Sequence, residues 1–211
     1  MLQYKGVIFD LDGVICFTDK FHYLAWKQVV EPLGVPFDEK INDRLRGVSR
    51  EHSLEIILEK YDGELTQEQK AALCEQKNVV YKELLKNLSP SDVSEDVLGT
   101  LSELKKRGIK IAIGSSSRNA RFILQGVGLL DTFDAIADGN SITHSKPHPE
   151  VFLQAAELLQ LSPSECLVVE DGESGIDAGV AGGFTTVGVG MAAKYAKTHY
   201  KVEKVSDLLK L

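Results

Sequence analysis

The sequence lacks the features that would place it in a membrane or outside the cell. It has no hydrophobic run of membrane-spanning length, and it enters an apolar strand without the basic region and cleavable apolar segment of a signal peptide. Its three cysteines, Cys16, Cys74 and Cys166, cannot all pair with one another and lack zinc-finger spacing. We therefore expect a cytoplasmic protein with reduced thiols.

Positive charge is also scarce. The 24 Lys and Arg residues stand against 31 Asp and Glu, and the resulting net charge of -7 repels polyanions. We expect no nucleic-acid or membrane partner, and a small anionic substrate would need cations placed locally. Repeats and low-complexity segments are absent, and 211 residues with 43% hydrophobic content are typical of one globular domain, or of a core domain carrying a smaller one.

The stretch from Tyr4 to Asp19 begins with the short apolar run Gly6–Phe9, which is typical of a parallel strand buried on both faces. Because side chains alternate along an extended chain, Asp10 and Asp12 should emerge on the same side of the strand end, with Leu11 in the core. Gly13 then permits a sharp turn. Alone, this pattern fits either a ligand site that calls for a cation or an ordinary solvated turn.

The next seventy residues have helical periodicity without a strand signal. Phe21, Ala25, Val29 and Leu33 recur at i+4, and Gly34 ends that pattern. Thr66–Gln69 is a capping box that opens a long helix, for which we predict a face of Leu73, Val80 and Leu84. A helical insertion directly after the first strand indicates a cap over the site.

Helices and strands alternate from Ser89 onward. A helix at 94–107, with Leu98, Leu101 and Leu104 facing inward, precedes a strand at 109–113, and further strands are predicted at 133–137, 166–169 and 186–189. Helices are expected at 119–127, 150–159 and 176–181, and the tail from 195 should close the sheet edge. This order predicts an α/β protein with a Rossmann-like, doubly wound parallel sheet, with a core at 1–16 and 89–211 and a helical cap at 17–88.

Polar residues follow four of these strands. They are Asp10 and Asp12, then Ser115, Ser116 and Ser117, then Lys146 before Pro147, and finally Glu170 and Asp171. Each set has an ordinary explanation as a helix cap, a surface turn or a solvated loop. Because the carboxyl ends of parallel strands share one edge, their coincidence favours a site.

The chemistry that fits this set is phosphoryl transfer to a carboxylate. Asp10 is the predicted nucleophile, and a Mg²⁺ ion bound by Asp10 and Asp171 would offset repulsion between two anions. Ser115 would hold phosphoryl oxygens, and Lys146 would stabilise the transition state. Asp12 is suited to exchange a proton with the leaving and incoming oxygens.

These residues resemble the four motifs of the haloacid-dehalogenase-like phosphotransferases. The motifs are the Asp10–Val14 segment with its strand, a Ser ending the second strand, Lys146-Pro147, and Glu170-Asp171 followed by Gly175-Ile176. The resemblance covers the whole chain and includes the helical cap. It implies a magnesium-dependent enzyme.

Within that superfamily the similarity is greatest to the β-phosphoglucomutases, on the residues His22, 25–27, 45–51, 77–78, 117–119 and 133–138. It implies interconversion of β-D-glucose 1-phosphate and glucose 6-phosphate through β-glucose 1,6-bisphosphate, by a monomer. By analogy, Arg50 would hold the phosphate that is not reacting, with Ser117, Arg118 and Asn119 meeting it from the core. The implied substrate-binding residues are Thr18, His22, Trp26, Gly47, Val48, Arg50, Lys77, Ser116, Ser117, Arg118 and Asn119; the implied metal ligands are Asp10, Asp12, Glu170 and Asp171.

Three alternative functions share parts of this pattern. A sugar-phosphate phosphatase on the same scaffold would use water as the acceptor, and Arg50 is the feature that favours transfer. A signalling receiver domain also has strand-end acids and a Lys, but the paired aspartates and the cap argue against it. A catalytically silent binding module remains, although every group needed for the chemistry is present.

Overall fold

The computed structural model describes residues 4–211 and contains one six-stranded sheet, in the order β3-β2-β1-β4-β5-β6, with every pairing parallel. The strands are β1 Gly6–Phe9, β2 Lys110–Gly114, β3 Ala135–Ala137, β4 Cys166–Glu170, β5 Thr185–Gly188 and β6 Tyr200–Lys201. Each of the first five was predicted to within two residues at either end. The short β6 lies at the edge, as expected for the tail.

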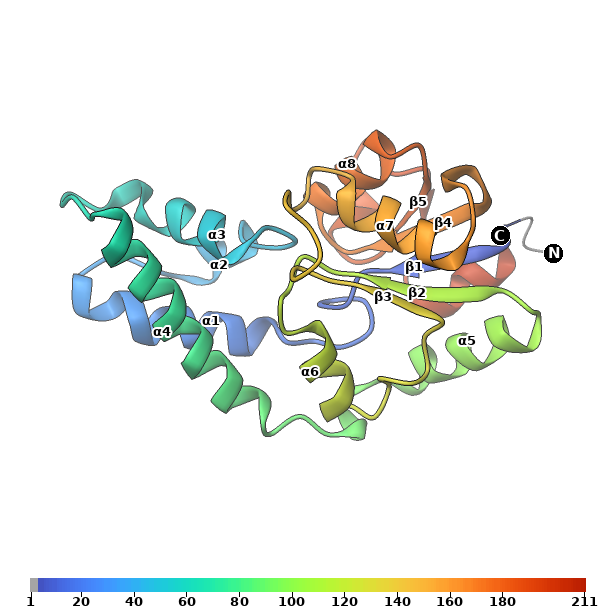
Figure 1. The fold of residues 1–211 in the computed structure, drawn as a ribbon, viewed down its shortest axis with the longest axis horizontal. Coiled ribbons are helices and arrows are strands. Elements are labelled where there is room, and N and C mark those ends of the chain that lie inside the picture. Colours follow the sequence, from blue (N-terminus) through green and yellow to red (C-terminus); the bar gives the residue numbers. More distant parts are fainter. Residues whose placement is uncertain (1–3) are drawn as a thin grey trace.

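Helices cover both faces of the sheet, which makes it doubly wound (Figure 1). α5 (Glu95–Lys106) and α6 (Ala120–Gly126) contribute to one hydrophobic cluster, and α7 (Glu150–Leu159) and α8 (Glu173–Ala181) to the other. β1 feeds both clusters, since Val7 and Phe9 belong to the first and Ile8 to the second. The strand order places β1 between β2 and β4. The residues that follow β1 are therefore flanked by the carboxyl ends of these two strands.

The segment between β1 and α5 is helical, as predicted. It contains α1 (Asp19–Val30), α2 (Glu39–Asp43), α3 (Arg50–Ile57) and α4 (Gln67–Leu85). These helices share a separate hydrophobic cluster around Trp26, Leu54 and Ile57. The sheet-proximal parts of α1 and α4 pack instead on the main cluster, through residues such as Phe21 and Leu85. The remaining helical elements are short 3₁₀ helices at Glu31–Leu33, Leu58–Lys60, Pro90–Asp92, Pro163–Glu165, Ala192–Lys194 and Val205–Lys210.

Local signals placed several helix ends correctly. Thr66 and Gln69 form the predicted capping box at the start of α4, and Ser94 accepts the Val97 N–H to cap α5. Gly34 has a φ of 69°, the left-handed conformation that ends the first helical pattern.

One residue of a predicted helix face is wrong, and another face is broader than predicted. Leu98 is 42% exposed, because the inward face of α5 is formed by Val97, Leu101 and Leu104, from which Leu98 is turned by about a quarter of a helical turn. In α4 the predicted residues Leu73, Val80 and Leu84 are partly buried and pack against the hydrophobic clusters. The fully buried residues are Cys74, Lys77, Tyr81 and Leu85, and the burial of Lys77 was not predicted because a charged residue adds nothing to a hydrophobic periodicity.

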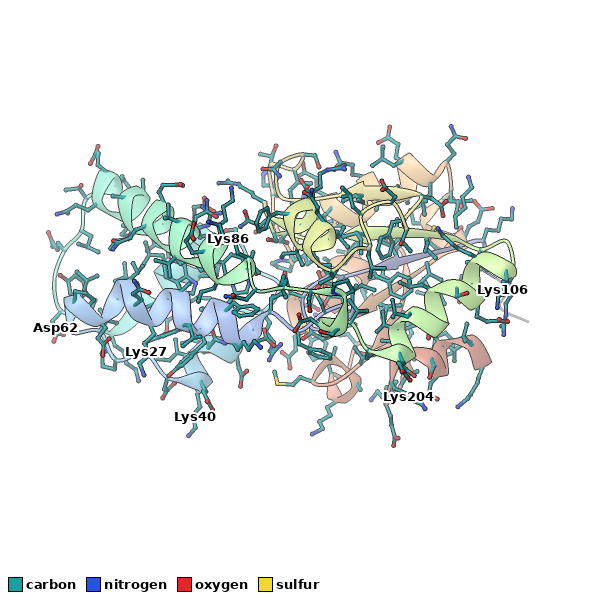
Figure 2. All side chains as sticks on the ribbon, turned by 90° about the horizontal axis from the view of Figure 1, so that it is seen from below. Lys27, Lys40, Asp62, Lys86, Lys106 and Lys204 are labelled. Carbon is teal, nitrogen blue, oxygen red and sulfur yellow. The ribbon has the colours of Figure 1, made fainter. Side chains whose placement is uncertain are left out.

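Charged side chains are spread over the outside of both parts of the molecule. Figure 2 shows Lys27, Lys40 and Asp62 on the helical cap and Lys106 and Lys204 on the α/β part, all exposed. Within residues 4–211, no helix combines the length and apolar character needed to cross a bilayer.

Candidate active site

The chain turns sharply after β1 and brings both aspartates of the first motif to one cavity. Asp10 and Asp12 line it, while Leu11 between them is fully buried in the core. The turn uses Gly13 at a φ of 89°, where a Cβ would lie 2.2 Å from the Asp171 carboxylate. Only glycine allows the first-strand loop to approach Asp171 this closely.

Lys146 is the buried cation beside Asp10. It follows β3 in a turn with a cis Lys146-Pro147 bond, and its ammonium donates to Asp10 and, at 2.6 Å, to Glu170. Burial opposes the charge of Lys146, but the two carboxylates outweigh burial and hold its pKa above the ordinary value. Glu170 lies in a cradle over Gly175, where a Cβ would be 1.9 Å from its carboxyl carbon.

Asp10, Glu170 and Asp171 each offer a carboxylate oxygen within 4.8 Å of the others, and all three are buried. Burial raises the pKa of Asp10 well above its usual range, and burial together with Glu170 raises the pKa of Asp171 to about 7. Lys146 does not cancel this accumulation of negative charge. An all-oxygen set of carboxylates is what Mg²⁺ prefers, so these residues fit that ion.

Asp12 lies outside that set of three. Its carboxylate accepts a hydrogen bond from the Thr18 hydroxyl at the start of α1. Burial raises the pKa of Asp12 to about 6, in spite of the Thr18 bond. A carboxyl group with a pKa near neutrality can both donate and accept a proton under physiological conditions.

Buried Lys77 and partly buried His22 form a pair on facing helices of the cap. The Lys77 ammonium lies 2.9 Å from His22 Nδ1 and 4.1 Å from the centre of the Tyr81 ring. Burial lowers the pKa of Lys77 to about 7, and burial and Lys77 together lower the pKa of His22 well below its usual range. His22 is therefore neutral, and its Nδ1 lies within hydrogen-bond distance of the Lys77 side-chain nitrogen.

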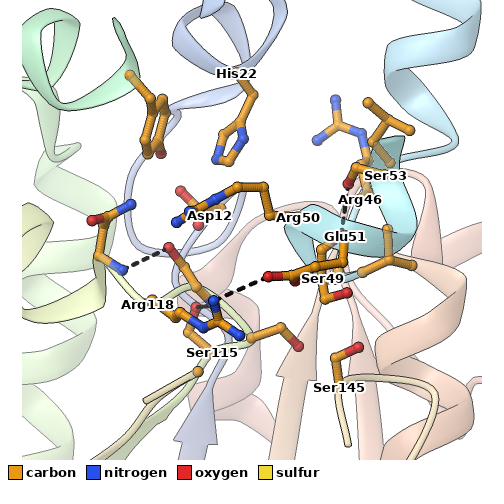
Figure 3. A pocket seen from close by; sticks show the side chains of 18 of the residues that line it. Asp12, His22, Arg46, Ser49, Arg50, Glu51, Ser53, Ser115, Arg118 and Ser145 are labelled. Carbon is orange, nitrogen blue, oxygen red and sulfur yellow. Dashed lines mark hydrogen bonds and ion pairs between the residues drawn. The ribbon is translucent and has the colours of Figure 1, made fainter. Parts of the chain in front are cut away.

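The cavity has a volume of about 430 Å³ and lies between the cap and the ends of the strands. Figure 3 shows Asp12 and Ser115 on the core side and Arg50 and His22 from the cap. The predicted site residues on its walls are Asp10, Asp12, His22, Trp26, Gly47, Val48, Arg50, Lys77, Ser115, Ser116, Ser117, Arg118 and Asn119. Of the remaining predicted residues, Thr18 bonds Asp12, and Lys146, Glu170 and Asp171 form the charged cluster at Asp10.

Arg50 supplies a second cationic position in the cavity. Its guanidinium donates to Asn78 at 2.9 Å, its ion pair with Glu75 is long at 3.8 Å, and its side chain is 14% exposed. Asn119 donates to the same Asn78 oxygen at 3.0 Å, so one amide joins cap and core. Arg118 differs, because it is half exposed and pairs with Glu51 at 3.0 Å.

Sequence reasoning included Arg46 in the 45–51 segment but gave it no role, and this residue joins the cap to the metal-ligand candidates. Its guanidinium pairs with Asp19 and with Asp171, the latter at 2.9 Å. Ser174 donates to the Arg46 carbonyl at 3.0 Å, and Gly47 lies so close to Ser174 that a Cβ there would be 2.5 Å from its hydroxyl. The position of Arg46 beside Gly47 was the only signal, and its partner lies 125 residues away.

A model of the haloacid dehalogenase-like hydrolases matches residues 4–183. The chain belongs to this family. The predicted resemblance and the Rossmann-like fold are thereby confirmed, and the chain is an enzyme of the haloacid dehalogenase-like superfamily.

Individual relatives match this chain over most of its length and most of their own. A β-phosphoglucomutase of Bacillus subtilis is 43% identical over 97% of this chain and 91% of its own length. A fructose-1-phosphate phosphatase of Escherichia coli is 31% identical over 89% of this chain and 97% of its own. The crystal structure of a β-phosphoglucomutase from Clostridium difficile superposes with a TM-score of 0.91 at 36% identity, covering 97% of this chain and 93% of that one.

Proposed function

We propose that this enzyme is a β-phosphoglucomutase, which interconverts β-D-glucose 1-phosphate and glucose 6-phosphate through β-glucose 1,6-bisphosphate. The observation that carries the proposal is that cations lie at two separate places of the site, one behind the wall residue Asp10 and one on the wall that the cap contributes. Lys146 is paired at Asp10, and Arg50 enters from the cap with a weak counter-charge. A sugar bisphosphate needs one cation at each phosphate, and the 43% identity to a β-phosphoglucomutase agrees with this choice.

In the proposed reaction, a carboxylate oxygen of Asp10 forms a bond to phosphorus as the bond to the sugar oxygen breaks. Asp12 gives its proton to that leaving oxygen. A molecule of β-glucose 1-phosphate then presents its free 6-hydroxyl. Asp12 takes the proton of that hydroxyl as the phosphoryl group passes from Asp10 to the sugar oxygen, which forms the bisphosphate again. The raised pKa of Asp12, about 6, suits a group that must do both.

Asp10, Glu170 and Asp171 would hold the Mg²⁺ ion. The ion would neutralise charge on the carboxylates and the phosphoryl group. Asp12, which we also predicted as a ligand, bonds Thr18 through its carboxylate, so we assign that carboxylate to proton transfer. Lys146 keeps Asp10 oriented and offsets its charge whether or not the ion is bound.

Arg50 would hold the phosphate that is not reacting, in place of its present hydrogen bond to Asn78. Asn119 and Ser117 approach the same region from the core. Lys77 and neutral His22 would position the sugar next to Asp12. Arg46 and Ser174 hold the cap loop against the core. Closing the cavity in this way excludes water, which transfer to a sugar hydroxyl requires.

The alternative is a sugar-phosphate phosphatase. It is supported by the relatives of about the same length that act as phosphatases, including one at 31% identity. Such an enzyme needs Asp10, Asp12, Lys146 and the metal, but it has no use for Arg50. A monomeric state, a cytoplasmic location and a division into core 1–16 and 89–211 and cap 17–88 also stay predictions.

Phosphorus NMR of the purified chain separates the two reactions. With Mg²⁺, β-glucose 1-phosphate and a trace of the bisphosphate, we expect the glucose 6-phosphate signal to grow as the starting signal declines. Inorganic phosphate growing instead, without glucose 6-phosphate, would assign the chain to the phosphatases.

A further inference from the structure

Two histidines and a glutamate lie on the outer side of the turn that carries Lys146. His144 precedes Lys146 by two residues and His148 follows it by two, and Glu150 begins α7. The imidazoles are 64% and 50% exposed, whereas the Lys146 side chain is fully buried. The turn therefore presents its lysine to Asp10 and its two imidazoles to solvent.

The Glu150 carboxylate is already fixed in place. One oxygen accepts the Thr143 N–H and the other accepts the His144 N–H, both at 2.8 Å. A carboxylate that is held by two backbone amides needs little reorganisation before it can bind a cation.

The three side chains have the spacing of a metal site. His144 Nδ1 lies 3.1 Å and His148 Nδ1 3.8 Å from the same Glu150 oxygen, and one ligand atom of each residue lies within 4.8 Å of the other two. Ligands about 2.0–2.1 Å from a tetrahedral ion are about 3.3–3.5 Å apart, so the two measured distances bracket the required one.

A hydrogen bond to the Glu150 carboxylate explains the position of His144 but not that of His148. A bond from His144 to Glu150 would account for the first imidazole. His148 is too far from the carboxylate for a hydrogen bond, and its Nδ1 accepts only a long 3.3 Å bond from the Glu150 N–H. Its ring nevertheless lies 4.7 Å from the His144 ring, at the same carboxylate.

We propose that His144, His148 and Glu150 form a second metal site, for a borderline divalent transition-metal ion such as Zn²⁺ or Ni²⁺. Two imidazoles and one carboxylate suit such ions, and water would fill the fourth position at this exposed location. The all-oxygen set at Asp10 has the opposite preference, for Mg²⁺. The two sites therefore differ in ligand chemistry and are independent of which sugar the enzyme uses.

An ion at this site would tie together the two ends of the Lys146 turn. The His148 N–H donates to the Ser145 carbonyl at 3.0 Å across that turn, and Thr143 and Ser145 line the substrate cavity on its inner side. Binding outside the cavity would thus restrict the loop that forms one of its walls. Slower hydrogen exchange of the His148 amide is the expected sign.

Calorimetric titration of Zn²⁺ into the full-length, untagged chain tests the site, with Mg²⁺ in large excess to occupy the carboxylates. We expect one zinc ion per chain, with binding weakened on the order of 100-fold or more in His144→Ala and in His148→Ala. His52→Ala is the matched control, since His52 is an exposed histidine on α3 and belongs to neither ligand set. Thermal melts confirm that the variants fold.

Zinc binding of unchanged strength in both His144→Ala and His148→Ala would place the ion elsewhere and overturn the proposal, as would the absence of binding to the wild-type chain. Exchange of the His148 amide provides a second readout. It should slow on addition of zinc in the wild-type chain and in His52→Ala. An unchanged rate in the zinc-bound wild-type chain would refute the restraint on the Lys146 turn.

Discussion

Replacing Arg50 by Ala should separate transfer between sugar oxygens from the chemistry at Asp10. The guanidinium is largely buried, its acidic partner Glu75 is 3.8 Å away, and its one short bond is to the neutral Asn78. Burial lowers the pKa of Arg50, which is the expected state of a buried cation that lacks a strong counter-ion. A phosphate would supply that counter-ion.

The size of the effect follows from these contacts. A planar guanidinium can donate two hydrogen bonds to a phosphate, each contributing about 1.5–3 kcal/mol. Giving up the bond to Asn78 offsets about 1 kcal/mol of this, which leaves roughly 2–5 kcal/mol. We therefore expect Arg50→Ala to lower kcat/KM for β-glucose 1-phosphate by about 30- to 4,000-fold.

The assay compares two reactions of the same variant. Conversion of β-glucose 1-phosphate is followed by coupled formation of glucose 6-phosphate, and hydrolysis of acetyl phosphate reports the chemistry at Asp10 without a second phosphate. Acetyl phosphate hydrolysis should change less than about threefold, because that substrate offers Arg50 no ligand. Arg44→Ala is the matched control: Arg44 is an exposed arginine of the same cap and pairs with Glu59 on the surface. Equal losses in both reactions would refute the role assigned to Arg50.

Three further substitutions test other parts of the site. Lys146→Met should abolish measurable turnover and lower the free energy of unfolding by about 3–5 kcal/mol in urea titrations, because it leaves Asp10 and Glu170 buried without their cation; a fully active variant would contradict this. Lys77→Met tests the lowered pKa of Lys77, which is about 7. Above pH 7 the unfolded chain keeps a proton that folded Lys77 has lost, so the free energy of unfolding of the wild type should rise between pH 7 and 9 by about 2 kcal/mol more than that of the variant. Urea titrations that show the same pH dependence for both proteins would exclude the shift. Gly175→Ala should lower the free energy of unfolding by about 1–3 kcal/mol and weaken Mg²⁺ binding, since its Cβ would displace the carboxylate of Glu170; unchanged calorimetric affinity would count against this packing.

The catalytic centre could be predicted from sequence because its residues are positioned by single strands. Each of Asp10, Ser115 and Glu170 follows or ends a strand whose apolar run is visible in the sequence, and parallel strands must end at one edge. These predictions needed only local patterns and one topological rule. Lys146 differs from these residues, because it lies in a turn well beyond the end of β3, which is two strands away from β1 in the sheet order.

Contacts between cap and core could not be predicted in this way. The ion pair from Arg46 to Asp171 and the amide of Asn78 between Arg50 and Asn119 join segments whose relative position no periodicity encodes. The burial of Lys77 was hidden for a related reason, because a charged residue contributes nothing to a hydrophobic stripe. Electrostatic partners between the cap and the core therefore required the structure.

The attack of Asp10 on phosphorus is tested most directly by trapping the phosphorylated enzyme. The chain is mixed with Mg²⁺ and β-glucose 1,6-bisphosphate, quenched in acid within one turnover, digested and analysed by mass spectrometry. We expect one phosphoryl group on the peptide that contains Asp10, and none in a folded Asp10→Asn variant. Label on another residue, or equal labelling of Asp10→Asn, would contradict the nucleophile assigned here.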